Sequence, residues 1–268
     1  MTPITQTQLV EQLRAMGVER EMTLVVHTSF RAVGPVDRGP EGLIDALSEA
    51  LGPSGTLVMP SMVGSRRTEP YDPSRTPTRN MGVVAETFWR LPEVLRSDHP
   101  TSSFAARGPM AAAITAPQPL VPEHGPDSPI GRVHELDGRV LLLGVEQDAN
   151  TTIHLAENLA GVPYRTRKWT TLLVDGRPDR VEFEQIDHCC ENFALVNEWL
   201  DEEGLQRRGI VGRGPARLAR SVDIVAAVVP RLRRDPLRFL HPVEARCEDC
   251  NAARSSIRTI SLMPRTPE

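Results

Sequence analysis

A histidine and a glutamate stand three residues apart just after an apolar run, at a place where chemistry is often sited. Residues 140–145 (VLLLGV) are typical of a strand covered on both faces, and residues 150–157 (NTTIHLAE) follow it. Ligand sites in such sheets gather at strand ends and in the loops beyond them. If a helix begins near Asn150, His154 and Glu157 share one face, and an imidazole and a carboxylate point into one space. The alternative is a hydrogen-bonded histidine on an ordinary helix.

The four cysteines fall into two short clusters, which is typical of a metal site. Cys189 and Cys190 are adjacent, Cys247 and Cys250 form a C-x-x-C, and His188 precedes the first pair. Thiolates and an imidazole suit tetrahedral zinc, so these five residues are the candidate ligands of a structural zinc ion. Both adjacent cysteines could bind only if the backbone turns sharply between them; otherwise one binds and His188 completes the set.

Two other readings of the cysteines are open. They could be reduced and unliganded. They could also form a thioredoxin-like redox pair, which is disfavoured because Cys247 follows a proline-interrupted segment and is not expected to open a helix within a βαβ unit.

Length and composition indicate a globular protein. With 268 residues, 40% of them hydrophobic, and no break in composition, residues 1–268 are expected to form one domain, either a single unit or two interlocked subdomains. A net charge of −4, from 31 basic and 35 acidic residues, is too balanced to indicate a nucleic-acid partner. The polar N-terminus has no signal-like pattern and no apolar run is long enough to cross a membrane, which predicts a cytoplasmic protein.

Helical and extended patterns alternate along the chain and predict a mixed α/β fold. Helical spacing marks residues 5–16, 39–51, 82–89, 192–200 and 221–232. Extended runs mark residues 23–29, 56–60 and 140–145, and two more flank a bend within 94–106. An Asp-Gly pair within 170–183 predicts a hairpin, so antiparallel pairing joins the parallel pairing of the buried strands. The irregular, Pro-rich and Arg-rich residues 61–80 predict a lid or binding loop.

Four segments stand in a recognisable order and spacing. They are 26–31 (VHTSFR), 55–60 (GTLVMP), 96–105 (RSDHPTSSFA) and 150–157 (NTTIHLAE). Together they resemble the aminoglycoside 3-N-acetyltransferase family, over about residues 27–242. Segments 187–190 (DHCC) and 247–250 (CEDC) further resemble the class IV branch, which acetylates apramycin and gentamicin.

The resemblance implies an enzyme that uses acetyl-coenzyme A and has the family's own α/β fold, a mixed sheet with surrounding helices. That fold is distinct from the GNAT fold, and the chain lacks the R/Q-x-x-G-x-G/A loop with which the GNAT fold holds pyrophosphate. It also implies transfer of an acetyl group to the 3-amino group of the 2-deoxystreptamine ring, which gives antibiotic resistance. Family members often pair as homodimers.

The resemblance assigns His154 as the catalytic histidine and Asp187 as the acid that orients it, with Glu184 and Glu157 as rival orienters. An aminoglycoside amine is mostly ammonium at neutral pH, so the reaction needs a base such as imidazole. A carboxylate on the other ring nitrogen would fix the tautomer and stabilise the imidazolium. Direct transfer needs no acyl-enzyme; a covalent intermediate on Ser29 is the alternative.

Further roles concern binding. The residues expected along the pantetheine and phosphates of coenzyme A are Ser29, Arg31, Ser102 and Ser103, and Arg31 is favoured because guanidinium matches phosphate in a fork. The carboxylates expected to pair with the ammonium groups of the antibiotic are Asp72, Glu86 and Glu157. Two alternatives remain: an acetyltransferase of this fold for another amine, and a zinc-dependent hydrolase or binding protein. The second is disfavoured because four protein ligands leave zinc no open position.

Overall fold

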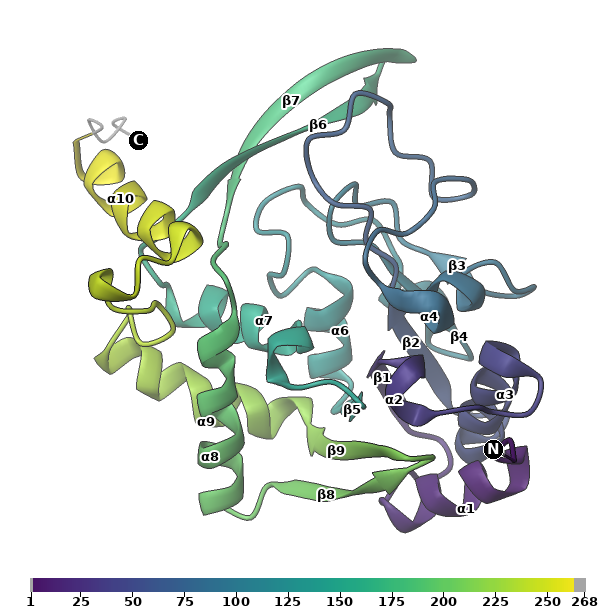
Figure 1. Cartoon of the computed structure of the whole chain (residues 1–268). Coiled ribbons are helices and arrows are strands. Elements are labelled where there is room, and N and C mark those ends of the chain that lie inside the picture. The colour runs from purple at the N-terminus through teal and green to yellow at the C-terminus, as the bar shows by residue number, and fades with distance from the viewer. Residues whose placement is uncertain (1, 263–268) are drawn as a thin grey trace.

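A computed structural model describes residues 2–262, in which helices surround a seven-stranded mixed sheet (Figure 1). The strands are β1 (Thr23–Thr28), β2 (Thr56–Pro60), β3 (Leu95–Arg96), β4 (Phe104–Arg107), β5 (Arg139–Leu143), β8 (Gln206–Val211) and β9 (Gly214–Arg220). Their order across the sheet is β3-β4-β2-β1-β5-β9-β8. β1 pairs in parallel with β2 and β5, and β4 and β9 add to them in antiparallel fashion. The predicted mixed α/β fold is confirmed.

The central strands are buried on both faces because helices cover each side. Alternate residues of β1 enter different core clusters, with Val25 on one face and Leu24 and Val26 on the other. The helices on the Leu24 face are α1 (Gln6–Ala15), α3 (Gly39–Leu51) and α4 (Gly82–Phe88). Those on the Val25 face are α5 (Ala111–Ile114), α6 (Pro129–Glu135), α7 (Thr152–Ala160), α8 (Leu195–Glu202), α9 (Ser221–Arg234) and α10 (Glu248–Leu262).

The parallel strands β1 and β5 end at one edge of the sheet, and the segments that follow them meet there. β1 leads through Ser29 into the short helix α2 (Phe30–Val33), and β5 leads through η1 (Gln147–Ala149) into α7. The Asn150 side chain accepts a hydrogen bond from the Thr152 backbone N–H at 3.1 Å, and α7 ends at Gly161 in the left-handed region. The predicted helix after the buried strand is therefore present.

A separate two-stranded sheet forms a long hairpin of β6 (Thr166–Val174) and β7 (Arg177–Gln185). It arches away from the main sheet beside the irregular 61–80 segment (Figure 1). Asp175 and Gly176 both have positive φ, as the predicted tight turn requires. Two hydrogen bonds connect the hairpin to the loop: the Arg66 N–H donates to the Trp169 carbonyl, and the Thr171 hydroxyl donates to the Arg67 carbonyl, both at 2.7 Å.

Other elements were not predicted. They are the β8–β9 hairpin, the 3-10 turns η1 and η3 (Val243–Ala245), and the helices α2, α5, α6 and α10. The 3-10 turn η2 (Glu191–Ala194) stands at the start of the stretch predicted as helix over 192–200. α10 begins directly after Cys247, so the C-x-x-C does open a helix, but no strand follows that helix among the described residues and it is not part of a βαβ unit. Among residues 2–262 no helix combines the length and apolar character needed to cross a membrane.

Candidate active site

His154, on the first turn of α7, lines a cavity of about 590 Å³ at the edge where β1 and β5 end. Ser29 and Arg31, which follow β1, line the same cavity, as does Asp148 from η1. Residues 80–83, at the end of the irregular loop and the start of α4, contribute another wall. The fold thus brings a histidine from α7 to the same space as a hydroxyl and a guanidinium from the segment after β1.

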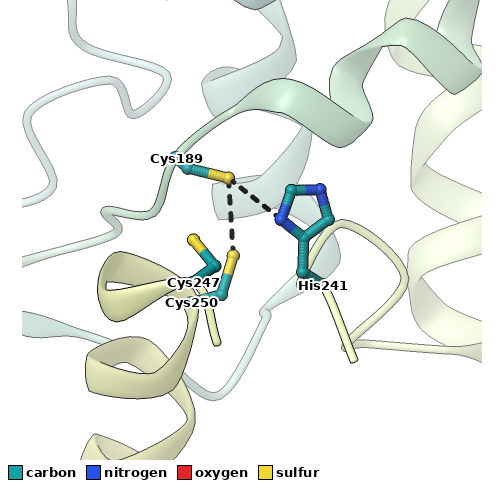
Figure 2. Close-up of side chains that lie close together, drawn as sticks. All are labelled: Cys189, His241, Cys247 and Cys250. Atoms are coloured by element: carbon teal, nitrogen blue, oxygen red, sulfur yellow. Dashed lines mark hydrogen bonds between the residues drawn. The ribbon is translucent and has the colours of Figure 1, made fainter. Parts of the chain in front are cut away.

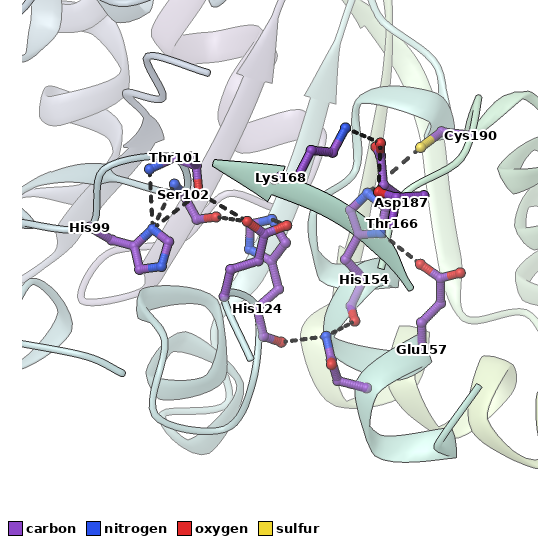
Figure 3. Close-up of polar contacts among 12 residues, drawn as sticks. His99, Thr101, Ser102, His124, His154, Glu157, Thr166, Lys168, Asp187 and Cys190 are labelled. Atoms are coloured by element: carbon purple, nitrogen blue, oxygen red, sulfur yellow. Dashed lines mark hydrogen bonds and ion pairs between the residues drawn. The ribbon is translucent and has the colours of Figure 1, made fainter. Parts of the chain in front are cut away.

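Glu157 is the acid that contacts His154. Its Oε2 lies 2.6 Å from His154 Nδ1, and its side chain is fully buried. Its Oε1 accepts a hydrogen bond from the Tyr164 hydroxyl at 2.6 Å and lies 2.9 Å from His188 Nε2. Burial opposes ionisation of this carboxyl, but the hydrogen bonds from His154 and His188 outweigh it and lower the pKa of Glu157 to about 2. The carboxylate is therefore ionised beneath the imidazole (Figure 3).

Asp187, the first choice as orienter, has other partners. Its carboxylate pairs with the Lys168 ammonium and accepts a hydrogen bond from the Thr166 hydroxyl at 3.3 Å, both from β6 (Figure 3). Strand pairing explains this, because Asp187 follows β7 and so lies beside the start of its partner strand. Glu184, another candidate for orienting His154, is on β7, and its carboxylate lies 3.9 Å from the Arg167 guanidinium.

The other nitrogen of His154 faces a thiol. Nε2 lies 3.6 Å from Cys190 Sγ. Burial alone would lower the pKa of His154, but Cys190 and the Glu157 carboxylate raise it well above the ordinary value. His124, stacked on His154 with ring centroids 5.4 Å apart, has a pKa lowered by burial and by its histidine neighbours. His27 also lines the cavity, and burial lowers the pKa of His27 to about 4.

A second cluster has the donor set of a metal site. Its ligand atoms all lie within 4.8 Å of one another and belong to Cys189, His241, Cys247 and Cys250 (Figure 2). We refer to these four residues as the Cys–His cluster. Three thiolates and one imidazole match structural zinc, which takes four such ligands in tetrahedral geometry.

The cluster differs from the predicted set in two ways. His188 and Cys190 are not in it, because Cys190 adopts a left-handed backbone conformation (φ 62°) and the two residues face Glu157 and His154 instead. His241 takes the fourth place and was not predicted. Its position six residues before Cys247 was the available signal.

His154, Glu157 and His188 also bring three ligand atoms together. Their oxygen–nitrogen distances of 2.6 and 2.9 Å are direct hydrogen bonds. A metal between such atoms would need bonds of about 2.0–2.2 Å to each. This group therefore acts as a hydrogen-bonded network.

The expected coenzyme A residues divide into two pairs. Ser29 and Arg31 line the cavity. Ser102 and Ser103 do not: both are buried, and their hydroxyls donate to Glu123 at 2.8 Å and to the Ser61 carbonyl at 2.7 Å. These two serines support the loops around the site and do not open onto the cavity.

The acids expected to bind the antibiotic are already paired. Asp72 accepts hydrogen bonds from Ser74 and Arg75 within its own loop. Glu86 accepts from Thr78, Trp89 and Arg90, and Glu157 lies beneath His154. Asp148 is the carboxylate that lines the cavity, and its place just after a buried strand could have indicated it.

Glu123 is a further acid that the sequence did not reveal. Burial raises its pKa to about 7, and its carboxyl accepts hydrogen bonds from Ser102 and from Thr101 at 3.0 Å. No local pattern marks it, because the partners come from a segment about twenty residues away.

A family model described as aminoglycoside 3-N-acetyltransferase matches residues 25–233. The chain belongs to this family. It is 55% identical over 240 residues to aminoglycoside N(3)-acetyltransferase IV of Salmonella sp, covering 89% of this chain and 91% of the relative. It is 35% identical over 257 residues to aminoglycoside N(3)-acetyltransferase VII of Streptomyces paromomycinus, covering 83% and 89%. The chain is thus an acetyltransferase enzyme, and the resemblance to class IV is confirmed.

Solved structures of the family superpose closely. The apoenzyme of aminoglycoside acetyltransferase AAC(3)-IVa has a TM-score of 0.92 at 55% identity, over 96% of this chain and 99% of that one. The H154A mutant of AAC(3)-IVa has been crystallised with a gentamicin and with apramycin, at TM-scores of 0.92 and 0.86. AAC-IIIb, 28% identical with a TM-score of 0.81 over 90% and 99% of the chains, is a binary complex with CoASH.

Proposed function

We propose that this enzyme transfers the acetyl group of acetyl-coenzyme A to the 3-amino group of the 2-deoxystreptamine ring of aminoglycosides, including gentamicin and apramycin, and so gives resistance. The observation that carries the proposal is the His154–Glu157 pair, whose histidine lines the cavity shared by Ser29 and Arg31. The antibiotic complexes of AAC(3)-IVa and the CoASH complex of AAC-IIIb support both substrates.

His154 acts as the general base. With its Nδ1–H donated to Glu157, the neutral ring keeps a lone pair on Nε2, which accepts a proton from the substrate ammonium. The freed amine attacks the thioester carbonyl, the C–N bond forms as the C–S bond breaks, and the new amide nitrogen releases its second proton to solvent. The departing thiolate takes a proton from the imidazolium, which yields coenzyme A and restores the base. The Glu157 carboxylate stabilises the imidazolium between these steps.

Ser29 and Arg31 hold the cofactor. Arg31 presents a guanidinium suited to a phosphate group, and Ser29 presents a hydroxyl at the end of β1, on the cavity that His154 also lines. An ammonium group of the antibiotic pairs with Asp148, the carboxylate that lines the cavity.

The decisive variant is His154→Ala. It should reduce acetyl transfer to gentamicin and apramycin by at least about 10²-fold, because the base is gone, while coenzyme A binding changes little. Thiol release measures transfer, calorimetry measures binding, and His134→Ala on α6 is the control. Retained turnover would reject His154 as the base. Thiol release with simple polyamines but with no aminoglycoside would favour a different amine substrate.

We also propose that the Cys–His cluster binds structural zinc. The four ligands would close the coordination shell, which argues against a zinc-dependent hydrolase, and the metal would link Cys189 after β7 to the start of α10. Metal analysis should find about one zinc per chain. Chelation should lower Tm by roughly 5 °C or more, because zinc binds the folded state alone. An unchanged Tm after zinc removal would exclude a stabilising metal.

A further inference from the structure

Three consecutive residues after β7 reach three different partners; Figure 2 shows Cys189 and Figure 3 shows Cys190. His188 Nε2 lies 2.9 Å from Glu157 Oε1. Cys189 belongs to the Cys–His cluster. Cys190 Sγ lies 3.6 Å from His154 Nε2. One short segment therefore joins the cluster to the catalytic histidine and to its carboxylate.

Regular secondary structure does not fix this segment. It lies between the end of β7 at Gln185 and the start of η2 at Glu191. Cys190 adopts a left-handed conformation, which is unfavourable for a residue with a Cβ and persists only where the surroundings impose it. The position of the segment must therefore depend on the partners of its side chains.

The hydrogen bonds also define the tautomer of His188. Its Nδ1 accepts the Cys190 backbone N–H at 3.1 Å, so that nitrogen carries no proton. The proton is on Nε2, which donates to Glu157 Oε1. The His188 side chain is fully buried, with Phe193 and Phe239 beside its ring. A displaced backbone at Cys189 would thus move a donor away from Glu157.

We propose that the Cys–His cluster anchors Cys189 and that His188 and Cys190 thereby hold Glu157 and His154 in the geometry needed for proton transfer. The inference rests on the proposed function. A metal ion in the cluster would then position the catalytic base as well as stabilise the fold. His188 and Cys190 are positioning residues, because they act through the Glu157–His154 pair.

The first test uses Cys250→Ser, which removes a cluster ligand on α10 without altering the segment itself. The matched control is Ser256→Ala on the same helix, which removes a hydrogen bond to the Arg165 N–H but no ligand. In Cys250→Ser we expect bound zinc to be lost and kcat to fall about 10–100-fold, while KM for acetyl-coenzyme A changes less than about threefold. The control should match the wild type in zinc content and kcat.

A second readout needs no substrate. In protein labelled with ¹⁵N-histidine, the His154 Nδ1–H proton should give a downfield signal, assigned by its absence in His154→Gln. This signal should broaden or shift in Cys250→Ser and stay unchanged in Ser256→Ala. If Cys250→Ser loses zinc but keeps both the signal and the wild-type kcat, the proposal is wrong. Wild-type protein without bound metal would overturn it too.

A second pair of variants decides the matter if Cys250→Ser does not fold. His188→Gln keeps an N–H donor for Glu157, and His188→Leu removes it. We expect His188→Leu to lose about 10–100-fold in kcat and to alter the His154 signal, and His188→Gln to recover most of both. Equal kcat and signal in wild type and His188→Leu would contradict the link. If no aminoglycoside is acetylated, the proposed function is wrong. The His154 Nδ1–H signal still tests whether the Cys–His cluster holds His154 in place, because it needs no substrate.

Discussion

Three hydrogen-bond donors converge on the Glu157 carboxylate, from His154, His188 and Tyr164. A carboxylate can accept all three, whereas a carboxylic acid or an amide must present a hydrogen to one of them. The network therefore requires an ionised Glu157, which agrees with its pKa of about 2. The negative charge next to the ring contributes to the raised pKa of His154.

Glu157→Gln should change the pH dependence of catalysis. Without the carboxylate the pKa of His154 should fall, so the acid limb of kcat/KM should move to lower pH, because the base loses its proton more readily. The plateau value of kcat should fall about 10²-fold, since a less basic and poorly oriented ring is a weaker base. Thiol release measured from about pH 5 to about pH 10 gives both quantities, a range that brackets the ordinary pKa of imidazole.

The control for this variant is Glu184→Gln, the rival orienter on β7. It should keep the wild-type profile, since Glu184 lies near Arg167 and not near His154. Ionisation of the substrate amine changes the pH profiles of both variants in the same way, so it does not affect the comparison between them. An acid limb that stays in place in Glu157→Gln would show that this carboxylate does not set the pKa of the base.

Sequence reasoning placed His154 and Glu157 together because three-residue spacing on a helix is a local rule. It ranked Asp187 above Glu157 as orienter, and this was wrong because the pairing of Asp187 depends on where β6 lies. Full burial of Glu157 also removes it from the acids able to meet the antibiotic. The choice of Asp187 as orienter and the choice of Glu157 as an antibiotic-binding acid failed for the same reason. Both depend on contacts between segments far apart in the sequence, which residue spacing does not predict.

At the scale of elements, the regular β6–β7 hairpin lies beside the irregular residues 61–80 (Figure 1). They are connected by the Thr171 hydroxyl and the Trp169 carbonyl, which bond to the backbone of Arg67 and Arg66. The hairpin was predictable because Asp-Gly needs a tight turn. Its contacts with the loop were not, since they join residues about a hundred positions apart.

Thr171→Val should loosen the loop without disturbing the strand, because valine is also β-branched. If residues 61–80 contact the antibiotic, KM for gentamicin should rise about fivefold, in line with the loss of about 1 kcal/mol from one hydrogen bond. KM for acetyl-coenzyme A and kcat should stay near the wild-type values. Steady-state kinetics with each substrate varied in turn checks this expectation.

Thr170→Val is the neighbouring control. Thr170 is buried, and its hydroxyl has no hydrogen-bond partner among the described residues. This variant should leave KM for gentamicin unchanged. If Thr171→Val and Thr170→Val behave alike, the loop contact has no part in antibiotic binding.

Over the whole molecule, one core cluster runs from the central sheet to the cysteine region. It contains Val25 and Val58 of the sheet, Phe239 before η3, and Cys250 and Ala253 of α10. The ligands of the Cys–His cluster come together across this core from positions 52 and 61 residues apart. Spacing alone does not choose between His188, which adjoins Cys189, and His241, which stands six residues before Cys247; the fold makes the choice.

The shared core predicts that the zinc-bound enzyme unfolds as one unit. Differential scanning calorimetry should give a single transition with equal calorimetric and van't Hoff enthalpies. Two resolved transitions would instead support two interlocked subdomains. A homodimer, the cytoplasmic location and the absence of a nucleic-acid partner stay predictions.

The main sheet positions the cavity residues, whereas the arched hairpin contacts the 61–80 loop, and this difference matters for inhibitor design. A compound bound between Ser29, Arg31 and His154 would contact the residues to which we assign cofactor binding and proton transfer, so substitutions that weaken its binding should also impair acetyl transfer. A compound held by the hairpin and the 61–80 loop would rest on a separate sheet joined to that loop by few bonds. Escape mutations should therefore arise more readily against the second kind of drug.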